Sequence, residues 1–148
     1  MGCSVPTAFL QEMVLEQVLL VTGGSCGIGA ATALLAAGAG YAVAVNYVGR
    51  EDAAREVVRR IGAGGGRAIA VQGDAASEAD VLRLFAEVDA RLGRLTGLVN
   101  NAGVVDLAHQ VPMGPGGTAE EVAQAIVWLL SPQASYTTMS MLDVSGGR

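Results

Sequence analysis

Residues 18–29 read VLLVTGGSCGIG and join a short apolar run to a glycine-rich turn. The apolar run has a β-branched valine at each end, which is typical of a strand buried on both faces. Residues 28–37 are rich in Ala and Leu and contain no proline, which favours a helix. The amides and the positive dipole end of that helix face the turn, so the sequence predicts an anion site suited to a pyrophosphate. A glycine-rich turn without a ligand is the competing interpretation.

Strand and helix patterns alternate after this unit. We expect further strands over residues 41–46, 68–71 and 95–99, and further helices over residues 51–61 and 77–92. Ser77 and Asp80 are placed like an N-cap residue and its reciprocal partner. Strands separated by helices of this length form a parallel sheet, because parallel neighbours need a long crossover. The sequence therefore predicts an α/β fold of three layers.

The pattern is interrupted once and then resumes. Residues 103–117 are rich in Gly and Pro, with one Gln and one His, and show no sustained period, which indicates a loop. Thr118 and Glu121 form a capping box for a helix over residues 118–130. A last strand is expected over residues 139–144.

This last strand completes the expected sheet in the order 3-2-1-4-5. Residues 139–144 should lie parallel beside residues 95–99, since an open edge there leaves backbone groups unsatisfied. A right-handed connection then places the helix over residues 118–130 on the same face as the helix over residues 77–92.

Composition bounds the class of protein. The 148 residues suit one domain, with residues 1–16 as a poorly specified N-terminal extension in which two acidic residues interrupt any signal or membrane segment. A net charge of -5 argues against nucleic acid as a partner. Cys3 and Cys26 are too few for a disulfide framework and no metal-ligand cluster is present, so we expect a cytoplasmic protein without a metal. All nine Lys+Arg residues are Arg, which excludes any mechanism that needs a lysine amine.

Polar residues follow two of the later strands. Gly73 and Asp74 follow the third strand, where a carboxylate can accept from an adenine amino group. Residues 100–103, Asn-Asn-Ala-Gly, follow the fourth strand, where side-chain amides can bridge neighbouring strand ends. Ordinary turn chemistry is the alternative in both places.

Taken together, the motifs resemble the short-chain dehydrogenase/reductase family, whose fold is Rossmann-like. The family set is Thr-Gly-x-x-x-Gly-x-Gly, then an aspartate after strand three, then Asn-Asn-Ala-Gly, and the likeness runs from residue 18 to residue 104. It resumes over residues 112–122, 134–138 and 143–147. Between residues 106 and 111 the family would place its catalytic asparagine, serine and Tyr-x-x-x-Lys helix, and the Pro-Gly turn that receives the nicotinamide. The chain therefore resembles an internally truncated member of the family.

This resemblance implies an NAD(P)-binding site and no catalytic residue. The implied cofactor-binding residues are Gly23, Ser25, Cys26, Gly27, Ile28, Gly29, Asn46, Tyr47, Asp74, Ala75, Asn101, Ala102 and Gly103. An NAD-selecting carboxylate is expected where Asn46 and Tyr47 stand, and Arg50 follows closely, which leans slightly toward NADP. Tyr136 and His109 are the remaining candidates for acid or base work, but Tyr136 lacks the partner lysine and His109 lies in the interrupted stretch.

The sequence leaves three functions open. The chain is an NAD(P)-dependent oxidoreductase by resemblance, a catalytically impaired nucleotide-binding remnant, or a non-catalytic interaction module. The third alternative acts through residues 118–147, which resemble elements through which the family commonly dimerises, so that the chain pairs with itself or with full-length relatives.

Overall fold

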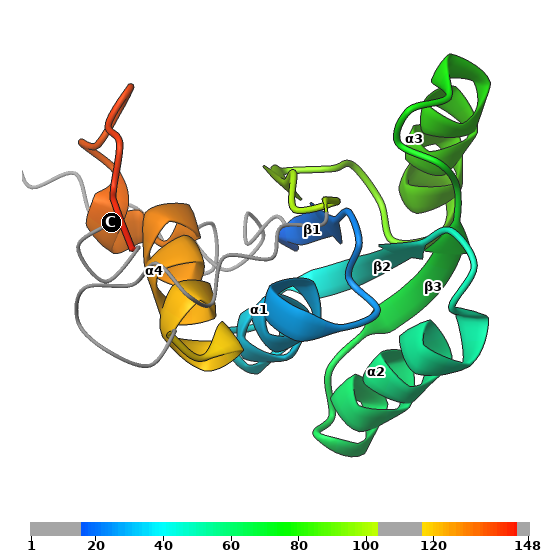
Figure 1. The fold of residues 1–148 in the computed structure, drawn as a ribbon, viewed down its shortest axis with the longest axis horizontal. Coiled ribbons are helices and arrows are strands. Elements are labelled where there is room, and N and C mark those ends of the chain that lie inside the picture. Colours follow the sequence, from blue (N-terminus) through cyan, green and yellow to red (C-terminus); the bar gives the residue numbers. More distant parts are fainter. Residues whose placement is uncertain (1–15, 104–116, 145–148) are drawn as a thin grey trace, which may run out of the picture.

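The computed structural model describes residues 16–103 and 117–144 of the chain. Strands and helices alternate through the first of these ranges (Figure 1). In chain order the elements are β1 (Val18–Val21), α1 (Gly27–Gly38), β2 (Ala42–Tyr47), α2 (Glu51–Ala63), β3 (Ala68–Gln72), α3 (Glu78–Arg91), β4 (Gly97–Val99), α4 (Ala119–Leu130) and a 3-10 turn, η2 (Pro132–Ala134). The expected loop over residues 103–117 and the N-terminal extension lie almost wholly outside the described residues.

A parallel four-stranded sheet organises the described residues, in the order β3-β2-β1-β4. This order confirms the predicted arrangement of the first four strands. All four residues of β1 and all six of β2 are buried, which agrees with the apolar character of residues 18–21 and 42–45.

Helices cover the sheet on both sides and complete the three layers. Side chains that alternate along β1 and β2, such as Leu19 and Val43, belong to one core with residues of α1, α2 and α4. Their sequence neighbours, such as Leu20 and Ala44, belong to a second core with Leu84 and Val88 of α3. In Figure 1, α3 accordingly lies on the opposite side of the sheet from α1 and α2.

Helix α4 packs against α1. The predicted right-handed connection required it to lie on the α3 face of the sheet. Its residues Ile126, Val127 and Leu130 join the core that contains Ala33 and Ala36 of α1. The Tyr41 hydroxyl donates to the Leu130 carbonyl at 2.7 Å and ties the end of α4 to the start of β2. The predicted face was wrong because small side chains on α1 let the apolar side of α4 approach closely.

The predicted fifth strand is also wrong. Residues 139–144 form no strand, and Figure 1 shows the chain after η2 rising beyond α4, away from the sheet. The position of α4 explains this result. With α4 on the α1 face, a strand added beside β4 would complete a left-handed crossover, which parallel connections almost never use.

The N-caps follow the sequence closely, with one difference. The Thr118 hydroxyl accepts from the Glu121 N–H, and the Glu121 carboxylate accepts from the Thr118 N–H at 2.7 Å, which is the predicted capping box. The Ser77 hydroxyl caps α3, but the Asp80 carboxylate accepts from the Asp74 N–H at 2.8 Å. The Asp80 carboxylate therefore bonds to the preceding loop and not to Ser77, the N-cap residue of its own helix.

The capping box gives a stability prediction for α4. We expect Thr118→Ala to lower the free energy of unfolding by about 1 kcal/mol, because it leaves the first-turn amide of Glu121 without its acceptor. Urea unfolding followed by circular dichroism measures this loss. Thr138→Ala is the matched control, since Thr138 is exposed and its hydroxyl bonds to no described residue. Equal stability of the two variants would contradict a structural role for the cap.

Candidate functional site

All four strands end at one edge of the sheet, since the sheet is parallel. The structure therefore brings the four predicted segments together at this carboxyl edge, although they are far apart in sequence. They are the glycine loop after β1, Asn46 and Tyr47 at the end of β2, residues 73–75 after β3 and residues 100–103 after β4. Ligands of open α/β sheets bind at such an edge.

The glycine loop needs glycine at particular positions. Gly23 and Gly27 have φ of 61° and 54°, a left-handed backbone that side chains disfavour. Gly29 is required for closeness, since a Cβ there would lie 2.5 Å from the Gly23 carbonyl oxygen and 2.6 Å from the Asn101 Nδ2. The start of α1 is therefore held directly against the ends of β1 and β4.

The amino-terminal end of α1 is open to an anion. Cys26 is the N-cap residue and is exposed, makes no capping hydrogen bond with its side chain, and no acidic residue lies in the first turn. Among the described residues, none accepts a hydrogen bond from the amides of residues 25–29. Free amides and the helix dipole together favour a negatively charged group at this point.

Thr22 and Asn101 lock this loop to the end of β4. The Thr22 hydroxyl accepts from the amides of Asn101 and Ala102 at 2.9 and 3.0 Å. The Asn101 Nδ2 donates to the carbonyls of Thr22 and Gly23 at 2.9 and 3.3 Å. The predicted bridging of strand ends by a side-chain amide is thus present. Thr22 positions the loop, and the site predicted from sequence omitted it. Its place directly before the first glycine of the loop was the feature of the sequence that could have identified it.

Asn46 makes the corresponding link to β2 and β3. Its side chain is 1% exposed, its Oδ1 accepts from the Gly23 amide at 3.3 Å, and its Nδ2 donates to the Gly73 carbonyl at 2.8 Å. The Tyr47 side chain is likewise buried, in the core on the α1 face. Both side chains were predicted at the ribose position, but the structure turns them inward and leaves Val48, 60% exposed, at the surface.

Asp74 lies exposed beyond β3 with its backbone fixed. Its Oδ1 accepts from the Ala76 amide at 2.9 Å, and its own N–H donates to the Asp80 carboxylate. That N–H, followed by Arg83, holds the pKa of Asp80 below its ordinary value. Ala75, next in the chain, is exposed as well. An ionised Asp80 therefore keeps the loop carrying Asp74 in position down to acidic pH.

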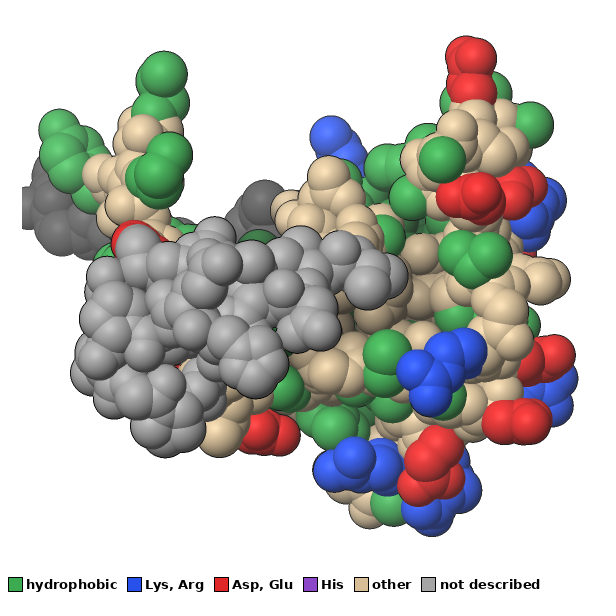
Figure 2. All heavy atoms as spheres, in the orientation of Figure 1, with side chains coloured by type: hydrophobic (Ala, Val, Ile, Leu, Met, Phe, Trp, Pro, Cys, Tyr) green, Lys and Arg blue, Asp and Glu red, His purple; other side chains and the backbone are tan. Residues whose placement is uncertain are grey.

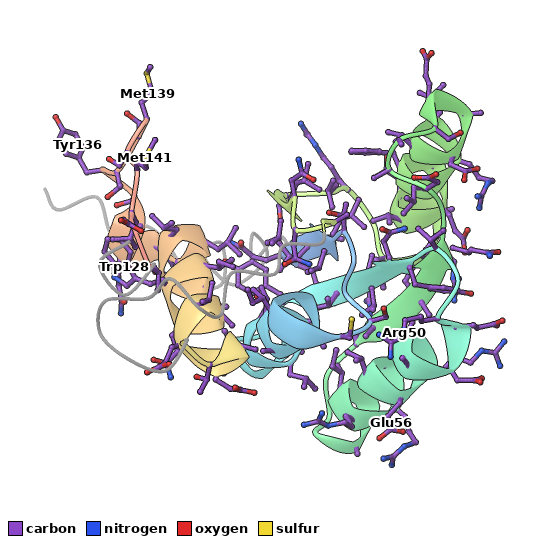
Figure 3. The ribbon with its side chains drawn as sticks, in the orientation of Figure 1. Arg50, Glu56, Trp128, Tyr136, Met139 and Met141 are labelled. Carbon is purple, nitrogen blue, oxygen red and sulfur yellow. The ribbon has the colours of Figure 1, made fainter. Side chains whose placement is uncertain are left out.

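The remaining candidates do not join this edge. Tyr136 is fully exposed, and Figure 3 shows it pointing into solvent beyond α4. His109 lies outside the described residues.

Within residues 16–103 and 117–144, no three His, Cys, Asp or Glu side chains lie close enough together to act as metal ligands. No helix in these ranges has the length and apolar character that a membrane span needs. A hollow of about 530 Å³ lies at the opposite end of β1, beside Val18 and Thr96.

Known proteins share this chain's sequence over most of its length. The family model described as short chain dehydrogenase matches residues 17–128. The uncharacterized oxidoreductase YgfF of Escherichia coli (strain K12) is 29% identical over 245 residues, covering 88% of this chain and 99% of the relative. Since the chain has 148 residues, a long internal stretch of that relative has no counterpart in it. A 3-oxoacyl-[acyl-carrier-protein] reductase of Synechocystis sp. is 49% identical over 88 residues, which cover 60% of this chain and 36% of that protein.

Solved structures agree with the fold. Acetoin dehydrogenase YohF from Salmonella typhimurium matches with a TM-score of 0.81 at 20% identity, covering 90% of this chain and 97% of that chain. The angucycline C-6 ketoreductase LanV, solved with bound NADP, matches with a TM-score of 0.56 at 40% identity over 65% of this chain and 41% of that one. The match to LanV thus covers less of both chains than the match to YohF does, at a higher sequence identity.

The close approach at Gly29 gives the next prediction. We expect Gly29→Ala to lower the free energy of unfolding by about 1–3 kcal/mol, because its methyl group displaces the Gly23 carbonyl or the Asn101 amide. Gly38→Ala in the same helix is the matched control, since a Cβ there meets nothing within 4 Å, and we expect it to be neutral or stabilising by up to about 1 kcal/mol. Chemical denaturation measures both, and comparable losses would contradict the assigned packing.

Proposed function

Because this chain belongs to the short-chain dehydrogenase family, we propose that it binds the adenosine and pyrophosphate part of NAD(P) at the carboxyl edge of its sheet. The observation that carries the proposal is the set of amides at residues 25–29, which donate to no described residue and are held against the strand ends by Gly29, where a side chain has no room. A pyrophosphate carries the charge that such a helix end favours.

The pyrophosphate and the adenine each have a counterpart in the described residues. The pyrophosphate would take the amides of Ser25, Cys26 and Gly27, and the adenine amino group would donate to Asp74, whose Oδ2 accepts from no described residue. Ile28, Ala102 and Gly103 line the same edge. Asn46 and Asn101 would act through the scaffold, because their amides already hold the glycine loop.

A lean toward NADP rests on Arg50. With Asn46 and Tyr47 turned inward, the surface after β2 is formed by Val48, Gly49 and Arg50, and it offers no carboxylate to a ribose 2′-hydroxyl before Glu51. Arg50 is the N-cap residue of α2, and Figure 3 shows it at that end of the helix. A guanidinium there suits a 2′-phosphate. LanV, solved with NADP, is consistent with this preference.

The proposal assigns no hydride-transfer activity to the chain. The matched part covers 36% of the Synechocystis reductase, and the internal stretch of YgfF without a counterpart is where the family resemblance places the catalytic residues. The chain contains no lysine to lower the pKa of a catalytic tyrosine. As a nucleotide-binding module poor in cysteine, it is expected to work in the cytoplasm.

A nucleotide titration tests the binding proposal. We expect calorimetry to give NADP and 2′-phospho-ADP-ribose dissociation constants within about tenfold of each other, because the nicotinamide finds no support in the described site. Gly29→Ala should weaken both, and Gly38→Ala neither. No binding of either compound would refute the proposal, and a large advantage for whole NADP would show a nicotinamide site.

Arg50→Ala separates the 2′-phosphate preference from general charge. We expect it to weaken 2′,5′-ADP by about tenfold and to leave ADP nearly unchanged, since only the former carries the phosphate that Arg50 meets. Arg55→Ala is the matched control, because Arg55 pairs with Glu51 one turn further along α2. An equal effect of the two variants would contradict the assignment of Arg50.

Turnover is a further test of the proposed function. We expect purified protein to oxidise NADPH on a panel of ketones at least about 10²-fold more slowly than a full-length family member, because proton transfer by a positioned acid is lost. Absorbance at the nicotinamide band follows the reaction. Family-like rates would overturn the assignment as a non-catalytic module.

A further inference from the structure

Gln72 links the end of β3 to the turn that carries Arg50. Its side chain is exposed, and its Nε2 donates to the Val48 carbonyl at 3.0 Å. Val48 and Gly49 are the only residues between the end of β2 and Arg50, the N-cap residue of α2. Among the described residues, no other group donates to the Val48 carbonyl. This hydrogen bond therefore joins two neighbouring strand ends beside the proposed 2′-phosphate site.

The turn from Val48 to Arg50 has few other restraints. Before it, the Tyr47 carbonyl accepts at 2.9 Å from an amide just beyond β3, and at its end the Arg50 carbonyl accepts at 3.1 Å from an amide of α2. Between these two points Val48 is 60% exposed, and a Cβ on Gly49 would meet nothing within 4 Å. Glycine adds wide backbone freedom at this point. The peptide group between Val48 and Gly49 is thus fixed, within the described part of the chain, by Gln72 alone.

The charge around Arg50 does not select a phosphate by itself. The first turn of α2 carries Glu51 and Asp52, and Glu51 pairs with Arg55. Figure 2 shows basic and acidic side chains mixed over α2, at the lower right of the view, with no continuous basic patch there. The Arg50 guanidinium forms no ion pair with a described carboxylate. Recognition of a 2′-phosphate therefore depends on where this guanidinium is held, since a bidentate contact needs a defined geometry.

We propose that Gln72 is a positioning residue for 2′-phosphate recognition, because its hydrogen bond to Val48 fixes the turn from which Arg50 reaches the nucleotide. This inference rests on the proposed preference for NADP and extends it to a residue of another strand. Ordering a long arginine side chain costs conformational entropy, and a fixed backbone limits the positions from which it must be ordered. In this arrangement Gln72 does not touch the phosphate and acts only through Arg50.

Titration of Gln72→Met with ADP and with 2′,5′-ADP tests this role. Methionine keeps the length of the glutamine side chain and removes the donor without adding a charge. We expect 2′,5′-ADP to bind about threefold to tenfold more weakly and ADP to change by less than about twofold, because one hydrogen bond to the turn is lost. Gln124→Met is the matched control, since Gln124 is exposed on α4 and its side chain bonds to no described residue. This control should leave the binding of both nucleotides unchanged.

A double-mutant cycle separates positioning from direct contact. If Gln72 acts through Arg50, Gln72→Met should change the binding of 2′,5′-ADP by less than about 1.5-fold once Arg50→Ala is present. Additive losses would show that Gln72 contacts the phosphate independently, and they would overturn the proposal. An equal loss of ADP and 2′,5′-ADP binding in Gln72→Met would overturn it as well, because that result indicates general damage to the site.

The same titrations distinguish failure of this inference from failure of the proposed function. If the unmodified chain binds neither nucleotide, both are wrong. If it binds ADP and 2′,5′-ADP equally well, nucleotide binding stands, but the NADP preference and the role of Gln72 are wrong. If it prefers 2′,5′-ADP, loses that preference with Arg50→Ala and keeps it with Gln72→Met, only the positioning role of Gln72 is overturned.

Discussion

Two side-chain amides, Asn46 and Asn101, hold the glycine loop where the four strands end. Asn46 reaches from β2 to the Gly23 amide and the Gly73 carbonyl, and Asn101 reaches from β4 to the carbonyls of Thr22 and Gly23. Backbone groups at a sheet end have no ladder partner of their own, and a buried one left unpaired is costly. The loop can therefore expose its remaining amides because its other polar groups are already satisfied.

Local patterns were sufficient to predict most of the fold. Val18–Val21 is apolar throughout and flanked by glycine, and Thr118 with Glu121 is a complete cap, so short stretches of sequence determine these features. The face chosen by α4 depends instead on contacts with Ala33 and Ala36, about ninety residues earlier, and no local pattern records them. The predicted strand over residues 139–144 failed as well, and the predicted face of α4 had been derived from that strand's expected place beside β4.

The candidate site shows the same division between local and distant causes. Glycine spacing located the loop, and the residues after β3 and β4 were found because parallel strands end together. Asn46 stands where a ribose contact is expected, but its burial follows from Gly73 and Gly23 converging on it, which the sequence around Asn46 does not contain. What the resemblance added was the assignment of these residues to a nucleotide.

The anion site proposed for this chain is built from main-chain amides, and this has a consequence for its history. Side chains at residues 25, 26 and 28 can drift without removing a single donor, provided that the glycines between them persist. Catalysis by side chains has no such tolerance, because one substitution removes the reacting group. A lineage that loses its reaction is therefore expected to keep nucleotide recognition for much longer, as an inherited property of backbone shape.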